Sequence, residues 1–308
     1  MPQPPTLPVA QTRALEGHTG AVHVAAFSRD GMYCLTGSAD RSVRLWSLST
    51  GRCIKTYSTH GKDVLGVALP PAQQDNNRFA SCGMDRTVIL WDVSTGRPLR
   101  RWTEHTQRTN AVAFNSDASV IASASYDTSV RLWDCRAQNV WRPIQVLDDA
   151  RDSVEAVQIL GHEILTASVD GHVRVYDLRV GKITTDQVGH PVTSARMSND
   201  GNCVLAASLD STIRLFDRET GELLCDYKGH KNTEYRLIST LSYNDAHVIC
   251  GSEDGYIHMW DLVEGTIAHS LRAHAKAVSC VAYHPKAHAM VSTSLDGTVK
   301  VWESNDAE

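Results

Sequence analysis

The sequence predicts an all-β protein, a seven-bladed β-propeller, and three observations lead to this prediction. A unit of 40–45 residues recurs seven times, each unit contains a run in which apolar and polar residues alternate, and no segment shows a helical period over ten or more residues. A ring of four-stranded blades is the fold in which repeats of this length bury a continuous core.

The repeat is marked by an Asp that is followed six residues later by an aromatic residue. The seven pairs are Asp40–Trp46, Asp85–Trp91, Asp127–Trp133, Asp170–Tyr176, Asp210–Phe216, Asp254–Trp260 and Asp296–Trp302. Successive Asp residues are 45, 42, 43, 40, 44 and 42 positions apart. Each step has the length of one four-stranded blade, so the chain holds seven of them.

Within each pair the side chains alternate with period two, as in Val43-Arg44-Leu45. Period two with one apolar face indicates a strand rather than a helix. Most units also carry a His upstream of the Asp, often preceded by Gly, and an acid directly after the aromatic residue. This pattern resembles the WD-repeat family over about residues 12–303.

The resemblance also implies how the ring closes. Unit seven ends at Trp302-Glu303, one strand short of a blade, and residues 12–15 hold the place that residues 223–227 hold before His230. We expect this N-terminal strand to be the outer strand of the last blade, which removes an open end. The predicted domains are a propeller over 12–303, a flexible Pro-rich tail over 1–11 and a C-terminal tail over 304–308.

Four blades carry a His, Ser, Asp and Trp set that looks like a catalytic triad with an added indole. The sets are His18, Ser38, Asp40, Trp46; His105, Ser125, Asp127, Trp133; His230, Ser252, Asp254, Trp260; and His274, Ser294, Asp296, Trp302. An enzyme needs one such site, whereas this pattern recurs. The WD-repeat resemblance implies a buried structural tetrad instead.

Three blades depart from that pattern in ways that bear on stability, and one of them is blade five, which is two residues short before its first strand and has Phe216 for the Trp. Blade two has Gly83 in place of the expected Ser, and blade four has Ala150 near the position of the His. Because Asp127 completes a tetrad and Asp170 does not, we expect Asp127→Ala to lower the melting temperature more than Asp170→Ala.

Composition excludes several classes of function. The net charge of −5 argues against a partner held by phosphate neutralisation, so we expect no direct sequence-specific nucleic-acid binding. None of the eight cysteines forms a Cys-x-x-Cys pair, and we expect reduced core thiols. Residues 1–8 do not resemble a signal peptide, and no stretch approaches the roughly 20 apolar residues of a membrane helix.

No cofactor, metal set, phosphate-binding loop or unrepeated nucleophile–base pair is found in the sequence, so we predict a protein without enzymatic activity. The WD-repeat resemblance places the residue before each turn Asp, and residues just after each His, on the top face. We expect protein binding there, through residues of hot-spot and exposed apolar types. The candidates are Met84, Arg108, Tyr126, Leu209, Tyr235, Glu253 and Leu295.

Two successive blades end in Asp-x-Arg, at Asp134-Cys135-Arg136 and Asp177-Leu178-Arg179. This pair resembles the motif with which some propellers dock on the adaptor of cullin-4 ubiquitin ligases. Arg136 and Arg179 are therefore possible ligase-adaptor contacts. A substrate receptor of such a ligase is the alternative function.

Several stretches are more distinctive than a generic repeat requires. They are residues 147–154 (LDDARDSV), 162–171 (HEILTASVDG), 208–215 (SLDSTIRL), 220–224 (TGELL), 227–235 (YKGHKNTEY) and 260–265 (WDLVEG). They resemble the family of mitogen-activated protein kinase organizers. This resemblance implies a scaffold, monomeric within larger complexes, that assembles signalling kinases and their adaptors in the cytoplasm and associates with spliceosomal proteins in the nucleus.

Overall fold

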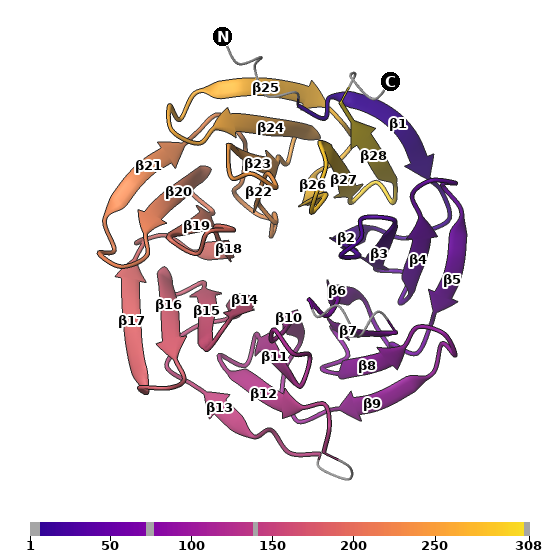
Figure 1. Cartoon of the computed structure of the whole chain (residues 1–308), viewed down its shortest axis with the longest axis vertical. Helices are drawn as coiled ribbons and strands as arrows, with labels where there is room; N and C mark the ends of the chain where they lie inside the picture. Colours follow the sequence, from indigo (N-terminus) through magenta and orange to yellow (C-terminus); the bar gives the residue numbers. More distant parts are fainter. Residues whose placement is uncertain (1–6, 72–76, 138–140, 305–308) are drawn as a thin grey trace.

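The structure is a computed structural model that describes residues 7–71, 77–137 and 141–304. These residues form seven four-stranded antiparallel sheets that surround a central channel (Figure 1). The described part of the chain contains strands and turns but no helix, and so none long and apolar enough to cross a membrane. The predicted all-β, seven-bladed propeller is confirmed.

In each blade, four antiparallel strands lie side by side from the channel outward. The innermost strands are β2 (Val22–Phe27), β6 (Val64–Ala68), β10 (Thr109–Phe114), β14 (Val154–Leu160), β18 (Val192–Met197), β22 (Thr240–Leu241) and β26 (Val278–Tyr283). The second strands are β3 (Tyr33–Ser38), β7 (Arg78–Gly83), β11 (Val120–Ser125), β15 (Glu163–Ser168), β19 (Cys203–Ser208), β23 (His247–Gly251) and β27 (Ala289–Ser294).

The third and fourth strands complete the blades. The third strands are β4 (Val43–Ser47), β8 (Val88–Asp92), β12 (Val130–Asp134), β16 (His172–Asp177), β20 (Thr212–Asp217), β24 (Tyr256–Asp261) and β28 (Val299–Glu303). The outer strands are β5 (Cys53–Tyr57), β9 (Pro98–Trp102), β13 (Gln145–Leu147), β17 (Lys182–Gln187), β21 (Leu223–Tyr227), β25 (Ile267–Arg272) and β1 (Ala10–Leu15).

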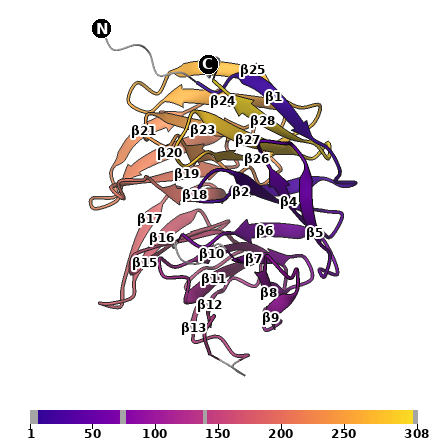
Figure 2. The same cartoon turned by 45° about the vertical axis from the view of Figure 1, so that its right-hand side comes forward.

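The ring closes through the first strand of the chain. β1 pairs with β28 in antiparallel register from Ala10↔Glu303 to Leu15↔Val299, and the two strands lie side by side (Figures 1 and 2). The strand begins at Ala10, two residues before the predicted boundary, and Leu7 packs on the core between blades six and seven. Of the two predicted tails, residues 1–6 and 305–308 lie outside the described residues.

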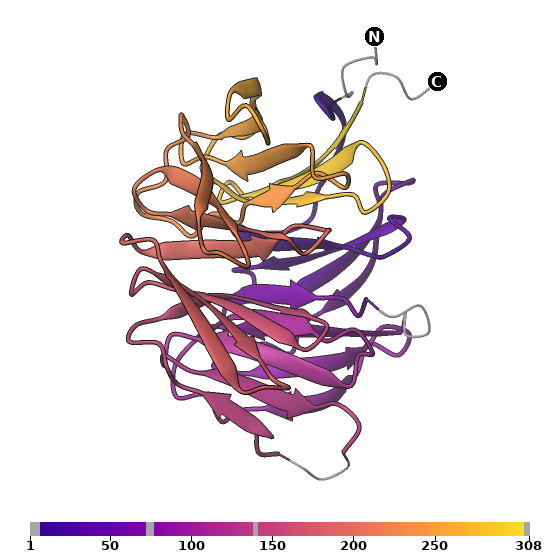
Figure 3. The same ribbon diagram turned by 60° about the vertical axis from the view of Figure 1, so that its left-hand side comes forward.

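The apolar core consists of seven clusters, one between each pair of neighbouring blades. Trp46 packs in the cluster between blades seven and one, and Trp91 in the cluster between blades one and two. Seen from the side, the sheets lie face to face around the ring (Figure 3). All eight cysteines are free, and Cys34, Cys82, Cys135, Cys250 and Cys280 are buried.

Blade six departs from the regular pattern at the channel. Its inner strand β22 has only two residues, and Ile238 makes an isolated parallel bridge to Cys280 of blade seven. The preceding segment is polar, with Lys231, Asn232 and Glu234 where other blades begin an apolar strand. This segment therefore does not extend the sheet, and the Arg236 that follows it bonds residues of blades two and three.

Candidate functional site

The recurring Asp forms the turn between the second and third strand of every blade. Its carboxylate accepts the backbone N–H of the residue two positions later in all seven blades: Ser42, Thr87, Ser129, His172, Thr212, Tyr256 and Thr298. An Asp side chain that bonds its own backbone two residues on stabilises a tight turn. These turns define the top face of the propeller.

A buried tetrad is present in blades one, two, three and seven. In blade three, His105 Nδ1 lies 2.8 Å from Asp127 Oδ2, and His105 Nε2 lies 2.7 Å from Ser123 Oγ. Trp133 Nε1 donates to the same hydroxyl at 2.8 Å. The network thus connects the loop that carries the His, the turn Asp and the Trp of the third strand. Since every member has a partner, it stabilises the blade.

The hydroxyl of each tetrad is not the one that the sequence analysis predicted. Thr36, Ser81, Ser123 and Ser292 supply it, whereas Ser38, Ser125 and Ser294 sit two residues later at the turn. There, for example, Ser125 Oγ accepts the N–H of Asp127 and donates to Arg108 O. The reason is the strand register. Ser123 pairs with Arg131 and so lies diagonally next to Trp133, while Ser125 is beyond the reach of the indole.

Two of the blade assignments are therefore wrong. Blade two, predicted to be incomplete because of Gly83, has a full tetrad through Ser81. Blade six, predicted to be complete, has Cys250 at the hydroxyl position. Both ring nitrogens of the buried His230 lack a hydrogen-bond partner in the described structure, and Trp260 Nε1 donates to Lys228 O instead.

We expect Cys250→Ser to stabilise the protein. A hydroxyl at this position would lie beside His230, as Ser292 lies beside His274, and would give the buried imidazole a partner. A satisfied buried hydrogen bond contributes about 1 kcal/mol, so the free energy of unfolding should rise by about that amount in urea titration.

The matched control is Cys82→Ser in blade two. Cys82 and Cys250 are equally buried and both belong to apolar clusters, but in blade two the imidazole of His60 already bonds to Ser81. A hydroxyl buried without a partner is unfavourable, so this variant should be less stable than the wild type. Equal changes in the two variants would contradict the assignment of the blade-six defect.

Blades four and five replace the His with an Arg from the third strand. Arg174 Nη2 donates to Asp170 Oδ2 at 2.7 Å, and Arg174 Nη1 donates to Ser168 Oγ at 2.9 Å. Arg214 makes the same contacts with Asp210 and Ser208. Burial opposes ionisation of Asp170, but hydrogen bonds from Arg174 and from the backbone of Arg151 hold the pKa of its carboxyl below the ordinary value. These blades therefore contain a different, fully paired network.

The tetrads offer no catalytic group to a substrate. The side chains of His18, His60, His105 and His274 are at most 1% exposed. Their ring nitrogens are used by an Asp and a hydroxyl of the same blade. The structural role predicted for these groups follows from this burial and from their recurrence around the ring.

The top face brings several predicted residues together with two others at the mouth of the channel. Arg108 lies over the ring of Tyr126, with 4.7 Å from its guanidinium carbon to the ring centroid, and 3.9 Å from Glu155 Oε1. Arg236, which follows the exposed Tyr235, lies 3.7 Å from Glu155 Oε2. We call these five residues the upper-mouth cluster. Tyr126 is 44% and Tyr235 45% exposed, so the cluster presents aromatic and cationic groups to solvent.

Arg236 is a residue that the sequence analysis missed. From blade six it reaches across the channel and donates to Asn110 O at 2.9 Å in blade three and to Leu65 O at 3.3 Å in blade two. The only signal in the sequence is the polar segment before it, because the contact joins positions 126 and 171 residues apart.

The other top-face candidates are less available. Glu253 is 5% exposed at its side chain, and its carboxylate accepts the N–H groups of Thr233, Glu234 and Tyr235. It therefore holds the 233–235 loop, and its carboxylate is already engaged within the free protein. Half-buried positions on this face are occupied by Met84, Leu209 and Leu295.

Arg136 and Arg179 lie at the opposite face, because each follows the end of a third strand. Their backbone N–H groups bond to Asp134 and Asp177, and both side chains are 67% exposed. Arg136 Nη2 lies 2.9 Å from Asp117 Oδ2, while Arg179 Nη2 lies 3.8 Å from Asp177 Oδ2. Exposed ion pairs of this kind contribute little to stability, so both guanidinium groups remain accessible to a partner.

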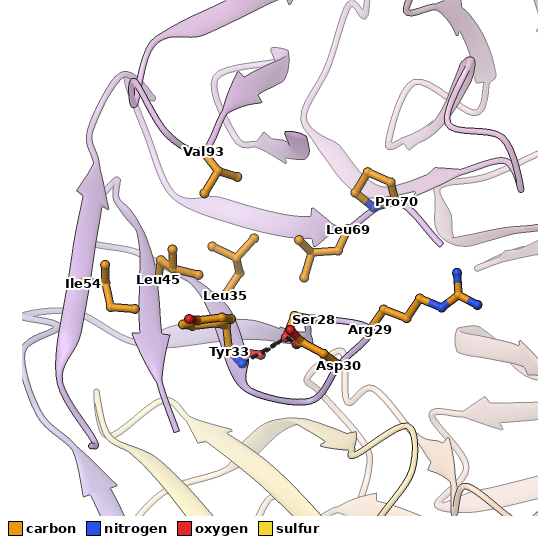
Figure 4. A pocket seen from close by; sticks show the side chains of 10 residues that line it. All are labelled: Ser28, Arg29, Asp30, Tyr33, Leu35, Leu45, Ile54, Leu69, Pro70 and Val93. Carbon is orange, nitrogen blue, oxygen red and sulfur yellow. Dashed lines mark hydrogen bonds between the residues drawn. The ribbon is translucent and has the colours of Figure 1, made fainter. Parts of the chain in front are cut away.

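An apolar pocket of about 270 Å³ lies on the same opposite face, between blades one and two (Figure 4). Tyr33, Leu35 and Ile54 of blade one face Leu69 and Val93 of blade two across it. The carboxylate at its edge, Asp30, is bonded by Ser28 Oγ and by Met32 N. The pocket therefore has apolar walls but no acid–base pair.

Among the described residues, one group of three side chains could approach a metal ion. Donor atoms of His162, Glu163 and Asp177 lie within 4.8 Å of one another. Arg218 pairs with Glu163, and Arg179 lies 3.8 Å from Asp177. Because these cations already neutralise the carboxylates, the group is poorly suited to a divalent cation.

Comparisons with known proteins agree with this architecture. A family model of the Nucleolar protein 10-like N-terminal domain matches residues 66–240. The model of the WD domain, G-beta repeat, matches residues 10–47, 221–261 and 265–303. The chain is thus a WD-repeat propeller, a class that generally mediates protein–protein interaction.

Curated relatives define its family more closely. WD repeat domain-containing protein 83 of Rattus norvegicus is 46% identical over 307 residues, which are 100% of this chain and 96% of the relative. The Homo sapiens protein of that name is 46% identical over 309 residues with the same coverage. The Dictyostelium discoideum homolog is 30% identical over 97% of this chain and 99% of its own length. The chain belongs to the family of WD repeat domain-containing protein 83.

Proposed function

We propose that this protein is a non-enzymatic scaffold that binds other proteins through the upper-mouth cluster. The observation that carries the proposal is the exposed pair of Arg108 and Tyr126, in which the guanidinium lies over the ring. Tyr and Arg are favoured among the residues that dominate binding energies at interfaces. The rigid ring supports them, so binding needs little reordering of the site.

The partners that we propose are signalling kinases with their adaptors, and spliceosomal proteins. The protein would then act in the cytoplasm and the nucleus, as a monomer within larger complexes. The support is the resemblance of its atypical blades four and five to kinase organizers. The chain also carries a net charge of −5, which favours protein surfaces over nucleic acid as partners.

We expect Arg108→Glu combined with Tyr126→Ala to abolish partner capture, because it removes the cation and the aromatic ring and reverses one charge. The measurement is a tagged pull-down at native expression from separate nuclear and cytoplasmic extracts, with nuclease, read by mass spectrometry. Splicing factors that survive nuclease treatment support direct contacts in the spliceosome. Kinase-pathway components support the signalling role.

The matched control is Leu99→Ala combined with Arg101→Glu on the exposed outer strand β9. It makes the same kinds of change away from the channel mouth and should leave capture intact. Unchanged capture by the Arg108 and Tyr126 variant, with an unchanged melting temperature, would contradict a top-face site.

A second candidate function is that of substrate receptor for a cullin-4 ubiquitin ligase. It is favoured by the exposure of Arg136 and Arg179 at one face, one blade apart. Blade four carries Tyr176 where the docking motif has Trp, which weakens the resemblance. Recovery of a cullin adaptor in the same pull-down would favour this function over the first.

A further inference from the structure

The central channel of about 530 Å³ has an unusual distribution of charge. The described residues that line it include Arg29, Arg196 and Arg236 but no Asp or Glu. This is the reverse of the balance in the whole chain, where acids outnumber bases by 35 to 30. A cavity with low-dielectric walls and charges of one sign concentrates its field on ions of the opposite sign.

Two of these arginines already have partners. Arg236 donates to Asn110 O and lies beside Glu155, and Arg29 Nη1 donates to Pro71 O at 2.8 Å. Arg196, on the innermost strand β18, makes neither a hydrogen bond nor an ion pair with any residue that the structure describes. Its five donors are therefore available to a ligand.

The surroundings of Arg196 leave room for that ligand. Arg196 pairs with Leu205, and the same register positions of the other regular blades carry Ala26, Ala68, Ala113, Gln158 and Ala282. All of these residues line the channel. At the depth of Arg196 the walls are thus mostly methyl groups, and the guanidinium is the one cation at that level.

No acid of the described residues forms an ion pair with this guanidinium. Asp245 is the charge that most favours the cation, but its oxygens accept the backbone N–H and the side-chain amide of Asn199, both at 2.7 Å. Desolvation by the surrounding channel walls lowers the pKa of Arg196 from its ordinary value, against the opposing influence of Asp245, although the residue itself is exposed to solvent in the channel. Asp245 thus attracts the guanidinium from a distance but does not occupy its donors.

We propose that the central channel binds a small, multiply charged oxyanion, such as a compound bearing phosphate groups, and that Arg196 is its principal contact. A guanidinium presents donors in a planar fork that matches two oxygens of a phosphate. The channel volume lies within the range of small-molecule sites. Arg236 crosses the upper mouth, so the ligand enters from the opposite face.

The test is isothermal titration of the full chain with pyrophosphate at low ionic strength. One equivalent should bind to the wild type, and Arg196→Gln should weaken binding by about tenfold or more, since charge-assisted bonds are lost. Arg136→Gln removes an exposed guanidinium outside the channel and should bind as the wild type does. Absence of binding by the wild type, or equal binding by Arg196→Gln, would overturn the proposal.

A second measurement needs no variant and so does not depend on folding of Arg196→Gln. Phenylglyoxal modifies accessible arginines, and peptide mapping measures the extent at each position. Pyrophosphate should protect Arg196 from modification. Arg136 and Arg179 should be modified to the same extent with and without pyrophosphate. Uniform protection of all three, or none at Arg196, would show that the channel is not the site.

Discussion

Asp170→Ala is expected to lower the free energy of unfolding by about 3–5 kcal/mol, the cost of leaving a buried charge without its partner. The side chains of Asp170 and Arg174 are both 7% exposed. Asp170 also accepts the N–H of Arg151 at 2.9 Å and of His172 at 3.1 Å. The substitution removes all these contacts and leaves the guanidinium of Arg174 in the protein interior without its carboxylate partner.

This expectation reverses the order that the sequence predicts. Asp127→Ala removes the contact of its carboxylate with His105, but His105 keeps its bond to Ser123. That loss should be smaller, because Arg131, whose Nη2 lies 4.0 Å from Asp127 Oδ2, is 17% exposed and can be hydrated when the carboxylate is removed. Urea titration of both variants measures the difference, and a larger loss for Asp127→Ala would restore the prediction made from the sequence.

A double variant separates the charge from the turn. Asp170→Ala combined with Arg174→Met removes both ions and keeps an unbranched apolar side chain in the third strand. Buried pairs can often be replaced by apolar residues at little cost, so this variant should be more stable than Asp170→Ala alone. If the double variant is as unstable as the single one, the turn contacts and not the stranded charge account for the loss.

The second large effect is a loss of stability in mild acid. Burial lowers the pKa of His230 to about 4 and that of His274 to about 4, and both side chains are almost fully enclosed. In the unfolded chain a His has a pKa near 6.5. Between pH 6.5 and 4 the unfolded state therefore binds protons that the folded state does not, and stability falls as the pH falls.

For each of these two histidines the expected loss between pH 7.5 and 5 is about 2 kcal/mol. The turn carboxylates do not add to it in this range. Hydrogen bonds overcome the opposing effect of burial and lower the pKa of Asp40 to about 2 and that of Asp210 to about 2. Their stabilising contribution is complete above the unfolded value near 4 and is lost only as the pH approaches 2.

The measurement is urea unfolding at pH 7.5 and pH 5. His230→Phe keeps a ring against Trp260 but cannot bind a proton, so it should lose about 2 kcal/mol less than the wild type between these pH values. His269→Gln on the exposed strand β25 is the control and should behave as the wild type does. A wild-type free energy that is equal at both pH values would contradict the assignment.

The candidate site could be predicted only in part. Arg108, Tyr126 and Tyr235 were predicted from their offsets to the His and the Asp of each repeat, and these offsets place them on one face. The part played by Arg236 and Glu155 depends on the width of the channel, which no offset reveals. For Glu253, the position in the repeat suggests a contact with a partner, but only the structure shows that its carboxylate bonds the neighbouring loop.

The sequence by itself determined the number of blades, the identity of the third strands and the turn at each Asp. These features depend on residues within a few positions of one another, such as the bond from Ser42 N to Asp40. Alternation and turn chemistry act over the same short range, so they can be read along the chain.

The tertiary structure alone decided which hydroxyl joins each tetrad, which buried cation replaces a missing His, and which arginine enters the channel unpaired. Strand register selects Thr36 over Ser38 for the bond to Trp46. The innermost strands of separate blades must lie around one channel before Arg196 shares its level with Ala26, Ala68, Ala113 and Ala282. Contacts of this kind join residues that are distant in the sequence, and only the closed ring brings them within bonding distance.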